Sequence, residues 1–146
     1  MTKQDLEQYN DLIIECEENE IAIKKIQREI DELKNMTVKD SVSGGFGGTQ
    51  HFVIEGTPIK NYESKIVSLR SIQQTMMKLQ HMAMEKRNEI EKFISSVDNS
   101  RIRRIIRYKY IDCLSWYEVA ERIGGKSNSE SVRKELERYL HSYNAS

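Results

Sequence analysis

A short helix with both of its ends marked is predicted by Ser115-Trp116-Tyr117-Glu118-Val119-Ala120-Glu121-Arg122-Ile123-Gly124. The hydroxyl of Ser115 can accept a hydrogen bond from a free amide of the first turn, and Glu118 can reach back to Ser115, which makes a capping box. Ala120 is small enough to let a second helix cross closely, and Gly124 can take the left-handed conformation that ends a helix. The residues expected to face inward are Trp116, Val119, Ala120 and Ile123.

A second, basic helix is predicted after the glycine turn. Ser127-Asn128-Ser129-Glu130 offers another capping box at its start. Val132, Leu136 and Leu140 would face inward and leave the charged residues of the helix more exposed. Two helices in this order are typical of a helix-turn-helix, in which the second helix lies in the major groove of DNA.

A further helix is predicted before this pair, running to Tyr110 with Asp98 or Ser100 as its N-cap. The Asp112-Cys113-Leu114 segment then forms a turn. The apolar face of this helix consists of Ile102, Ile105, Ile106 and Tyr110, and its remaining surface is crowded by Arg101, Arg103, Arg104 and Arg107.

These helices define a candidate DNA interface. Residues at the start of the second helix would meet base edges, and flanking cations would hold phosphates. The candidates for base contact are Asn128, Ser129, Arg133 and Lys134. The candidates for phosphate contact are Arg101, Arg104 and Lys126, and Arg138 extends the exposed basic face.

Residues 1–97 are expected to form a helical hairpin or coiled coil, with helices at about 3–34 and 59–97. Apolar residues recur in both segments at alternating steps of three and four, and such a stripe needs a partner helix. Self-association through the same stripes is the alternative to a hairpin within one chain. The stripes are Tyr9, Leu12, Cys16, Ile23, Ile26, Ile30 and Leu33, with Asn19 as the polar position, and Leu69, Ile72, Met76, Leu79, Ala83, Ile90, Phe93 and Val97, with Lys86 as the polar position.

The segment 35–58 between the two helices is expected to be a loop, because residues 44–48 contain four glycines. It lacks the Gly-Lys-Ser/Thr ending of a nucleotide-binding loop, so we do not expect phosphate binding there. His51-Phe52-Val53-Ile54 could form a short strand or pack on the helices. The methionines Met76, Met77, Met82 and Met84 could fill the core or form an adaptable binding surface, and we favour the core.

The charge distribution agrees with a C-terminal DNA-binding region, although the formal net charge of the chain is zero. Residues 1–35 have a net charge of −5, residues 36–97 of +2 and residues 98–146 of +3. Cys16 and Cys113 form no closely spaced pair, and no apolar run approaches a membrane span. We therefore expect a cytoplasmic protein without metal or cofactor. Scattered histidines and the lack of a catalytic set argue against an enzyme.

The segment from Ile102 to Leu140 resembles region four of bacterial sigma factors. The resemblance is carried by Arg107-Tyr108-Lys109-Tyr110, by residues 115–124, and by Val132-Arg133-Lys134-Glu135-Leu136-Glu137-Arg138. It implies a helix-turn-helix that recognises a promoter element. The sequence departs from the sigma pattern between Ala120 and Val132, where two extra residues lengthen the turn.

The whole chain also resembles small sigma-like prophage proteins of low-GC Gram-positive bacteria, in the style of the ArpU and RinA late regulators. This likeness covers the N-terminal helix, Asp40-Ser41-Val42 with the Gly-rich loop, Asp98-Asn99-Ser100-Arg101-Ile102-Arg103 and the Trp116 helix. It implies a phage transcription regulator that binds double-stranded DNA and works with host RNA polymerase at late promoters. The alternatives are a small terminase subunit for DNA packaging, which would assemble as a ring, and a protein-protein adaptor that does not bind DNA.

Overall fold

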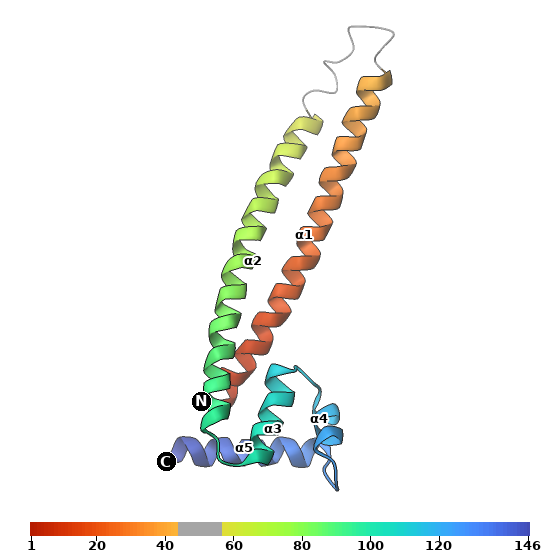
Figure 1. Cartoon of the computed structure of the whole chain (residues 1–146). Coiled ribbons are helices and arrows are strands. Elements are labelled where there is room, and N and C mark those ends of the chain that lie inside the picture. Colours follow the sequence, from red (N-terminus) through yellow and green to blue (C-terminus); the bar gives the residue numbers. More distant parts are fainter. Residues whose placement is uncertain (44–56) are drawn as a thin grey trace. The chain divides into compact units, whose positions relative to one another are not determined.

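The computed structural model describes the backbone of residues 1–43 and 57–146 and the side chains of residues 1–36 and 60–146. Nearly all of this part of the chain is helical (Figure 1). The elements are α1 (Lys3–Ser43), α2 (Thr57–Ser96), α3 (Ser100–Ile106), the π-helical turn η2 (Arg107–Ile111), α4 (Trp116–Ile123) and α5 (Ser129–Ala145). The all-α prediction is confirmed: α1 packs against α2 as a hairpin, and small C-terminal helices follow.

The predicted stripes form the inner side of the hairpin. On α1, Tyr9, Leu12 and Ile30 are buried, and on α2 the buried members include Ala83 and Ile90. An ion pair between Lys65 and Glu29 links the two helices. The steps of three and four therefore mark the packed face on both helices, as the sequence predicts.

The polar side chains at the two polar positions of the stripes form a hydrogen bond or an ion pair within their own helices. Asn19 is half-buried and donates from Nδ2 to the main-chain oxygen of Glu15 at 2.9 Å. The side chain of Lys86 is 19% exposed and forms an ion pair of 2.9 Å with Glu89. Because each group has a local partner, neither position leaves a buried charge or amide unpaired.

Helix α1 is longer than predicted. It continues to Ser43 instead of ending near residue 34, so the prediction of a loop is wrong for residues 35–43. The reason is that this stretch contains neither glycine nor proline before Gly44, and nothing in it interrupts the helix. Helix α2 begins at Thr57 with Pro58 in its first turn, where proline is well tolerated. The glycine-rich segment and the strand considered for residues 51–54 lie outside the described residues.

The methionines of α2 contradict the prediction that they fill the core. Met77 is 71% exposed, Met84 is 65% exposed and Met82 is also exposed, whereas Met76 is half-buried. The cause is register: Met76 falls on the packed stripe, and Met77 is turned away from it by one residue.

By its packing, the chain divides into two compact units: residues 1–14 with 80–146, and residues 15–79. The first unit joins the start of α1 and the end of α2 with α3, η2, α4 and α5. The second unit consists of the remaining parts of α1 and α2. The domain boundary predicted between residues 97 and 98 falls inside the first unit and stays a prediction.

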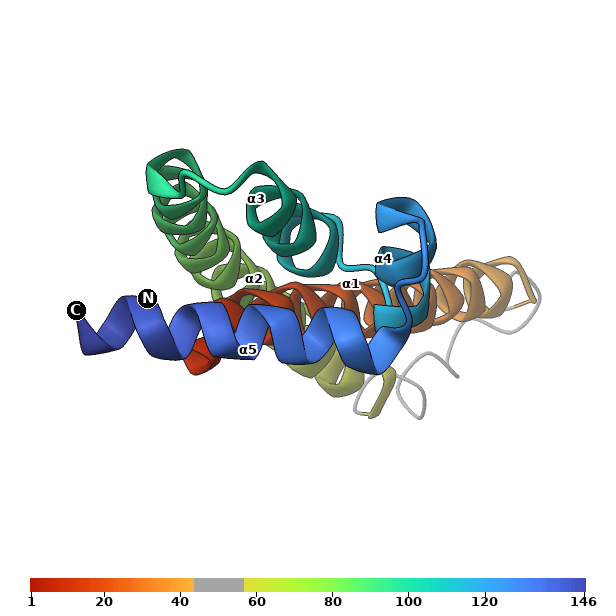
Figure 2. The same cartoon turned by 90° about the horizontal axis from the view of Figure 1, so that it is seen from below.

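Within the first unit, α5 contacts the start of α1 and the end of α2 (Figure 2). Lys3 forms an ion pair of 3.1 Å with Glu137, and Asn144 donates from Nδ2 to the main-chain oxygen of Met1 at 3.0 Å. The rings of Phe93 and Tyr143 meet edge to face with centroids 5.1 Å apart. These contacts order the C-terminal half of α5 and leave its first turns to the site described below.

Helix α3 begins with a different cap from the two predicted. Asn99 is the N-cap, and its Oδ1 accepts hydrogen bonds from the amides of Arg101 at 2.9 Å and Ile102 at 3.2 Å. Asp98 lies one residue too early, and Ser100 is already helical.

The helix predicted to run through Tyr110 changes its winding after Ile106. Residues 107–111 form a π-helical turn, closed by a hydrogen bond from the amide of Asp112 to the oxygen of Arg107 at 2.9 Å. Cys113, with φ of 54°, then ends the segment at the predicted turn. The prediction that Tyr110 faces inward is confirmed.

Candidate nucleic-acid interface

The core beneath the candidate interface is formed by the apolar faces of α3, α4 and α5. Val119 and Ala120 of α4 are buried, and so are Val132, Leu136 and Leu140 of α5. Full burial of each larger aliphatic side chain contributes about 1.5–3 kcal/mol. The inward residues predicted for α5 are therefore correct. They hold α4 and α5 against α3, whose buried residues are Ile102, Ile105 and Ile106.

Trp116 differs from the expectation that it lies inward in this core. The indole is half-buried, and the Nζ of Lys109 lies 5.3 Å from its ring centroid. Lys109 also donates to the main-chain oxygen of Leu114 at 3.0 Å. Trp116 therefore covers the side of the core beside η2. Ile123 is likewise only half-buried.

The start of α4 is fixed by the predicted capping box. The amide of Glu118 donates to Oγ of Ser115 at 3.3 Å, and the amide of Ser115 donates to Oε2 of Glu118 at 2.8 Å. These hydrogen bonds from Ser115 hold the pKa of Glu118 below its ordinary range, and the nearby charge of Arg122 acts in the same direction. The Glu118 carboxylate is therefore engaged in capping the start of α4.

The turn between α4 and α5 depends on glycine at two positions. Gly124 has φ of 77° and ψ of −170°, and Gly125 has φ of 71°. The positive φ at Gly124 agrees with the prediction, but its ψ lies outside the left-handed helical region, in a region that essentially only glycine adopts. This backbone leads the chain out of α4 and into the turn at 125–128.

The start of α5 is capped by Asn128, so the capping box predicted between Ser127 and Glu130 is wrong. The amide of Ser131 donates to Oδ1 of Asn128 at 2.8 Å, and the amide of Asn128 donates to Oγ of Ser131 at 3.0 Å. The box is shifted by one residue because serine at position 131 can act as the reciprocal partner. Glu130 instead forms an ion pair of 2.7 Å with Lys134.

Three of the predicted DNA contacts already form ion pairs within the chain. Arg101 donates from Nε to Glu135 at 2.9 Å and from Nη2 to Oγ of Ser127 at 2.9 Å. Arg133 pairs weakly with Glu137 at 3.4 Å, and Lys134 pairs with Glu130. Each pair is partly exposed, so exchange for a phosphate costs little.

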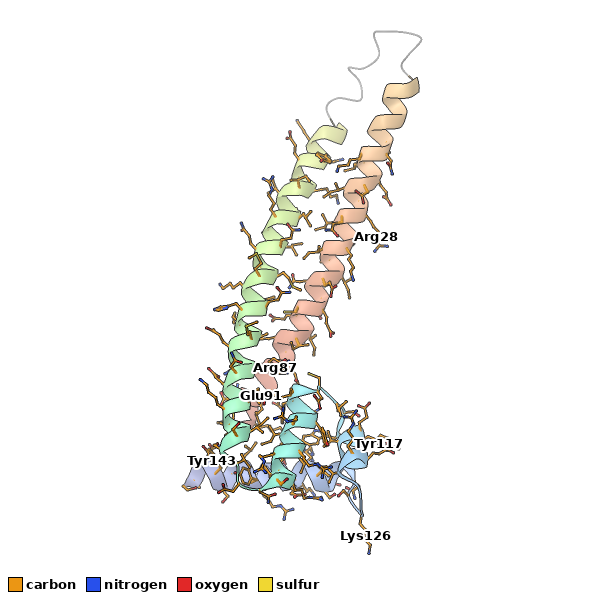
Figure 3. All side chains as sticks on the ribbon, in the orientation of Figure 1. Arg28, Arg87, Glu91, Tyr117, Lys126 and Tyr143 are labelled. Atoms are coloured by element: carbon orange, nitrogen blue, oxygen red, sulfur yellow. The ribbon has the colours of Figure 1, made fainter. Side chains whose placement is uncertain are left out.

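The other predicted contacts carry no ion pair within the described residues. Lys126 is exposed at the turn and points away from the helices (Figure 3). Arg138 donates only to the main-chain oxygen of Lys134, at 3.3 Å. Arg104 donates to the main-chain oxygen of Arg122 at 3.0 Å. Asn128 and Ser129 stand at the first turn of α5, where Asn128 serves as the cap and Ser129 is half-buried.

Arg122 and Tyr108 also belong to this surface, although neither was predicted from the sequence as a contact residue. Arg122, in the last turn of α4, lies with its Cζ 5.4 Å from the ring centroid of Tyr108, and Arg104 lies 5.7 Å from the same centroid. The available signal was the position of Arg122 at the end of the predicted helix. Its proximity to Arg104 depends on how α3 and α4 pack, which residue spacing alone does not reveal.

The charge on α5 itself is balanced. Residues 129–145 contain Glu130, Glu135 and Glu137 against Arg133, Lys134 and Arg138. Attraction to a polyanion must therefore come mainly from cations outside α5, namely Arg104, Arg122 and Lys126. Among the described residues, no group of histidine, cysteine, aspartate and glutamate side chains is arranged to hold a metal ion. In the same part of the chain, no helix combines the length and apolar character that a membrane span requires.

Comparison with family models, with curated proteins and with solved structures found no match for this chain.

Proposed function

We propose that this chain binds double-stranded DNA through α4 and α5 and acts as a sequence-specific transcription regulator of the phage type. In this proposal α5 enters the major groove, and α3 and α4 hold the sugar-phosphate backbone. The resemblance to small sigma-like prophage regulators adds host RNA polymerase at a late promoter as the partner. The chain would bind DNA without a cofactor and without catalysing a reaction.

The observation that supports this proposal most strongly is the geometry of the turn between α4 and α5. Gly124 and Gly125 let the chain reverse, and the Asn128 cap opens α5 with Glu130 and Ser131 exposed in its first turn. Opposite the buried Val132, the exposed side of α5 carries Ser131 and Lys134. Farther along that side are Arg138 and His141. Side chains of this length and polarity suit contact with base edges and phosphates.

The eight predicted contact residues keep distinct roles in the proposal. Asn128, Ser129, Arg133 and Lys134 are assigned to base edges. Arg101, Arg104, Lys126 and Arg138 are assigned to phosphates or the edge of the groove. Residues without an internal carboxylate partner should contribute most, because they lose no ion pair on binding.

One observation favours the adaptor as a second candidate. Several large apolar side chains of the long helices are exposed, among them Ile21, Met77 and Met84. Exposed apolar side chains on a helix can serve contact with another protein. This role is compatible with DNA binding by the C-terminal helices, and it becomes the main one if DNA binding fails.

The proposal is tested by comparing variants of α5 on a duplex enriched from a random pool by the full-length protein. Lys134→Ala should weaken binding to the enriched duplex by about 1–3 kcal/mol and relax the preference at one base pair. Lys78→Ala, an exposed cation on α2, serves as the matched control and should bind like the parent. Equal binding by all three proteins, or the recovery of no enriched sequence, would contradict sequence reading by α5. A ring-shaped oligomer in solution would favour the packaging alternative.

A further inference from the structure

Two arginines gather around one tyrosine on the exposed surface between α3 and α4. The guanidinium carbons of Arg104 and Arg122 lie 5.7 Å and 5.4 Å from the ring centroid of Tyr108. Arg104 also donates from Nη2 to the main-chain oxygen of Arg122 at 3.0 Å. The cation–π contacts and this hydrogen bond hold two positive charges close together and limit their motion.

The positive charge of this cluster is not neutralised by an ion pair within the described residues. The nearest acidic residues along α4 have other partners. Glu118 accepts hydrogen bonds from the Ser115 cap. Glu121 accepts a hydrogen bond from the hydroxyl of Tyr117, and this bond raises the pKa of Tyr117. Glu118 attracts Arg122 only at longer range, and neither arginine forms an ion pair within the described residues, so an anion bound between the two cations would be stabilised.

We propose that Arg104, Tyr108 and Arg122 form a clamp for one phosphate of the DNA backbone. The planar guanidinium matches a phosphate with paired donors, and among the described residues Arg104 donates only from Nη2. The Tyr108 ring keeps both guanidinium groups in place before DNA arrives. This inference rests on the proposed DNA binding and adds a specific site to it.

The position of the clamp gives it a role in docking. Arg122 lies in the last turn of α4, directly before the glycine turn that leads to α5. A phosphate held there fixes the backbone beside the first turn of α5 and so sets which base pairs this turn reaches. The clamp thus orients the reading helix and carries no sequence preference of its own.

Titrations of the full-length protein with the enriched and scrambled duplexes at several salt concentrations test the clamp. Arg122→Ala should weaken binding to both duplexes alike by about tenfold, the loss expected for one charged hydrogen-bonded contact. It should lower the slope of log K against log salt by about one unit. Arg87→Ala is the matched control and should change neither value, because Arg87 is an exposed arginine on α2 that forms no ion pair with any described residue. Tyr108→Phe should also bind like the parent because it keeps the ring, whereas Tyr108→Leu should weaken binding.

A scan with neutral methylphosphonates identifies the phosphate itself. At one position the neutral linkage should weaken binding by the parent but cause no further loss in Arg122→Ala. Thermal melting of each variant separates loss of the contact from loss of folding, and Arg122→Lys should retain the salt slope because it keeps the charge. If the parent binds DNA and no position shows this coupling, the clamp is wrong and the proposed function stands. If the parent binds no duplex, both proposals fail.

Discussion

The guanidinium Nε of Arg101 lies 2.9 Å from a carboxylate oxygen of Glu135, so an ion pair joins α3 to the middle of α5. Arg101 is one of the residues assigned to phosphate contact, and Glu135 places a negative charge beside it. The internal pair therefore competes with DNA for the arginine.

Replacing this carboxylate should make the DNA interface more attractive. Glu135→Gln frees Arg101 and removes a negative charge from α5, so binding to every duplex should strengthen. The salt slope should steepen by about 0.9 if one more phosphate is neutralised. Titration at several salt concentrations measures both effects, with Glu63→Gln on α2 as the control. Unchanged affinity and slope would show that Arg101 does not face DNA.

Burial predicts a difference in stability between two core positions of the C-terminal helices. Leu136 is 1% exposed, so Leu136→Ala should lower the free energy of unfolding by about 2–5 kcal/mol. Trp116 is half-buried, so Trp116→Ala should cost less, about 1–3 kcal/mol. Urea denaturation of the full chain measures both. A larger loss for Trp116→Ala than for Leu136→Ala would contradict the described core.

The hairpin can be tested with two isoleucines that are two residues apart on α1. Ile23 is half-buried on the packed stripe, and Ile21 is 67% exposed. Ile23→Asp should lower the stability of the hairpin by about 2–4 kcal/mol, because it places an unpaired carboxylate against α2. Ile21→Asp carries the same helix propensity penalty without that burial. Far-UV circular dichroism during thermal melting compares them, and identical melting would mean that the stripe does not pack.

The capping box of α4 predicts a specific pH dependence. The pKa of Glu118 is lower in the folded protein than its ordinary value of 4.5, mainly through hydrogen bonds from Ser115. The ionised carboxylate therefore contributes stability above that value, and this contribution is lost as pH falls through the folded pKa. Glu118→Gln keeps an acceptor but cannot ionise, so its deficit in stability relative to the parent should shrink as pH falls below about 4.5. A deficit that stays constant with pH would show that the charge of Glu118 plays no part.

Structural features that depend on residues close together in the chain could be predicted from the sequence. The steps of three and four, the Ser115 capping box and the glycine turn depend on residues within one or two turns of each other, and the sequence predicts all of them. The predicted end of α1 is too early because the loop inferred from the glycines of residues 44–48 was extended back to residue 35, although nothing in residues 35–43 breaks a helix.

Features that depend on packing between helices could not be predicted from the sequence. The exposure of Met77, the half-burial of Trp116 and the meeting of Arg104 with Arg122 over Tyr108 follow from how the helices are rotated and crossed. The ion pairs of Arg101 and Arg133 have the same origin or depend on the choice of rotamer. A pattern of charges in the sequence identifies a basic region but does not show which cations remain unpaired.

The most direct test of DNA recognition is a titration of the full-length protein against its enriched duplex and a scrambled duplex of equal length. The enriched duplex should bind at least about a thousandfold more tightly, as is typical of specific DNA-binding proteins. Binding to both duplexes should weaken steeply with salt, because phosphate contacts dominate the affinity. Equal affinity for the two duplexes, or no binding at low salt, would contradict the proposal that α4 and α5 form a sequence-reading helix-turn-helix.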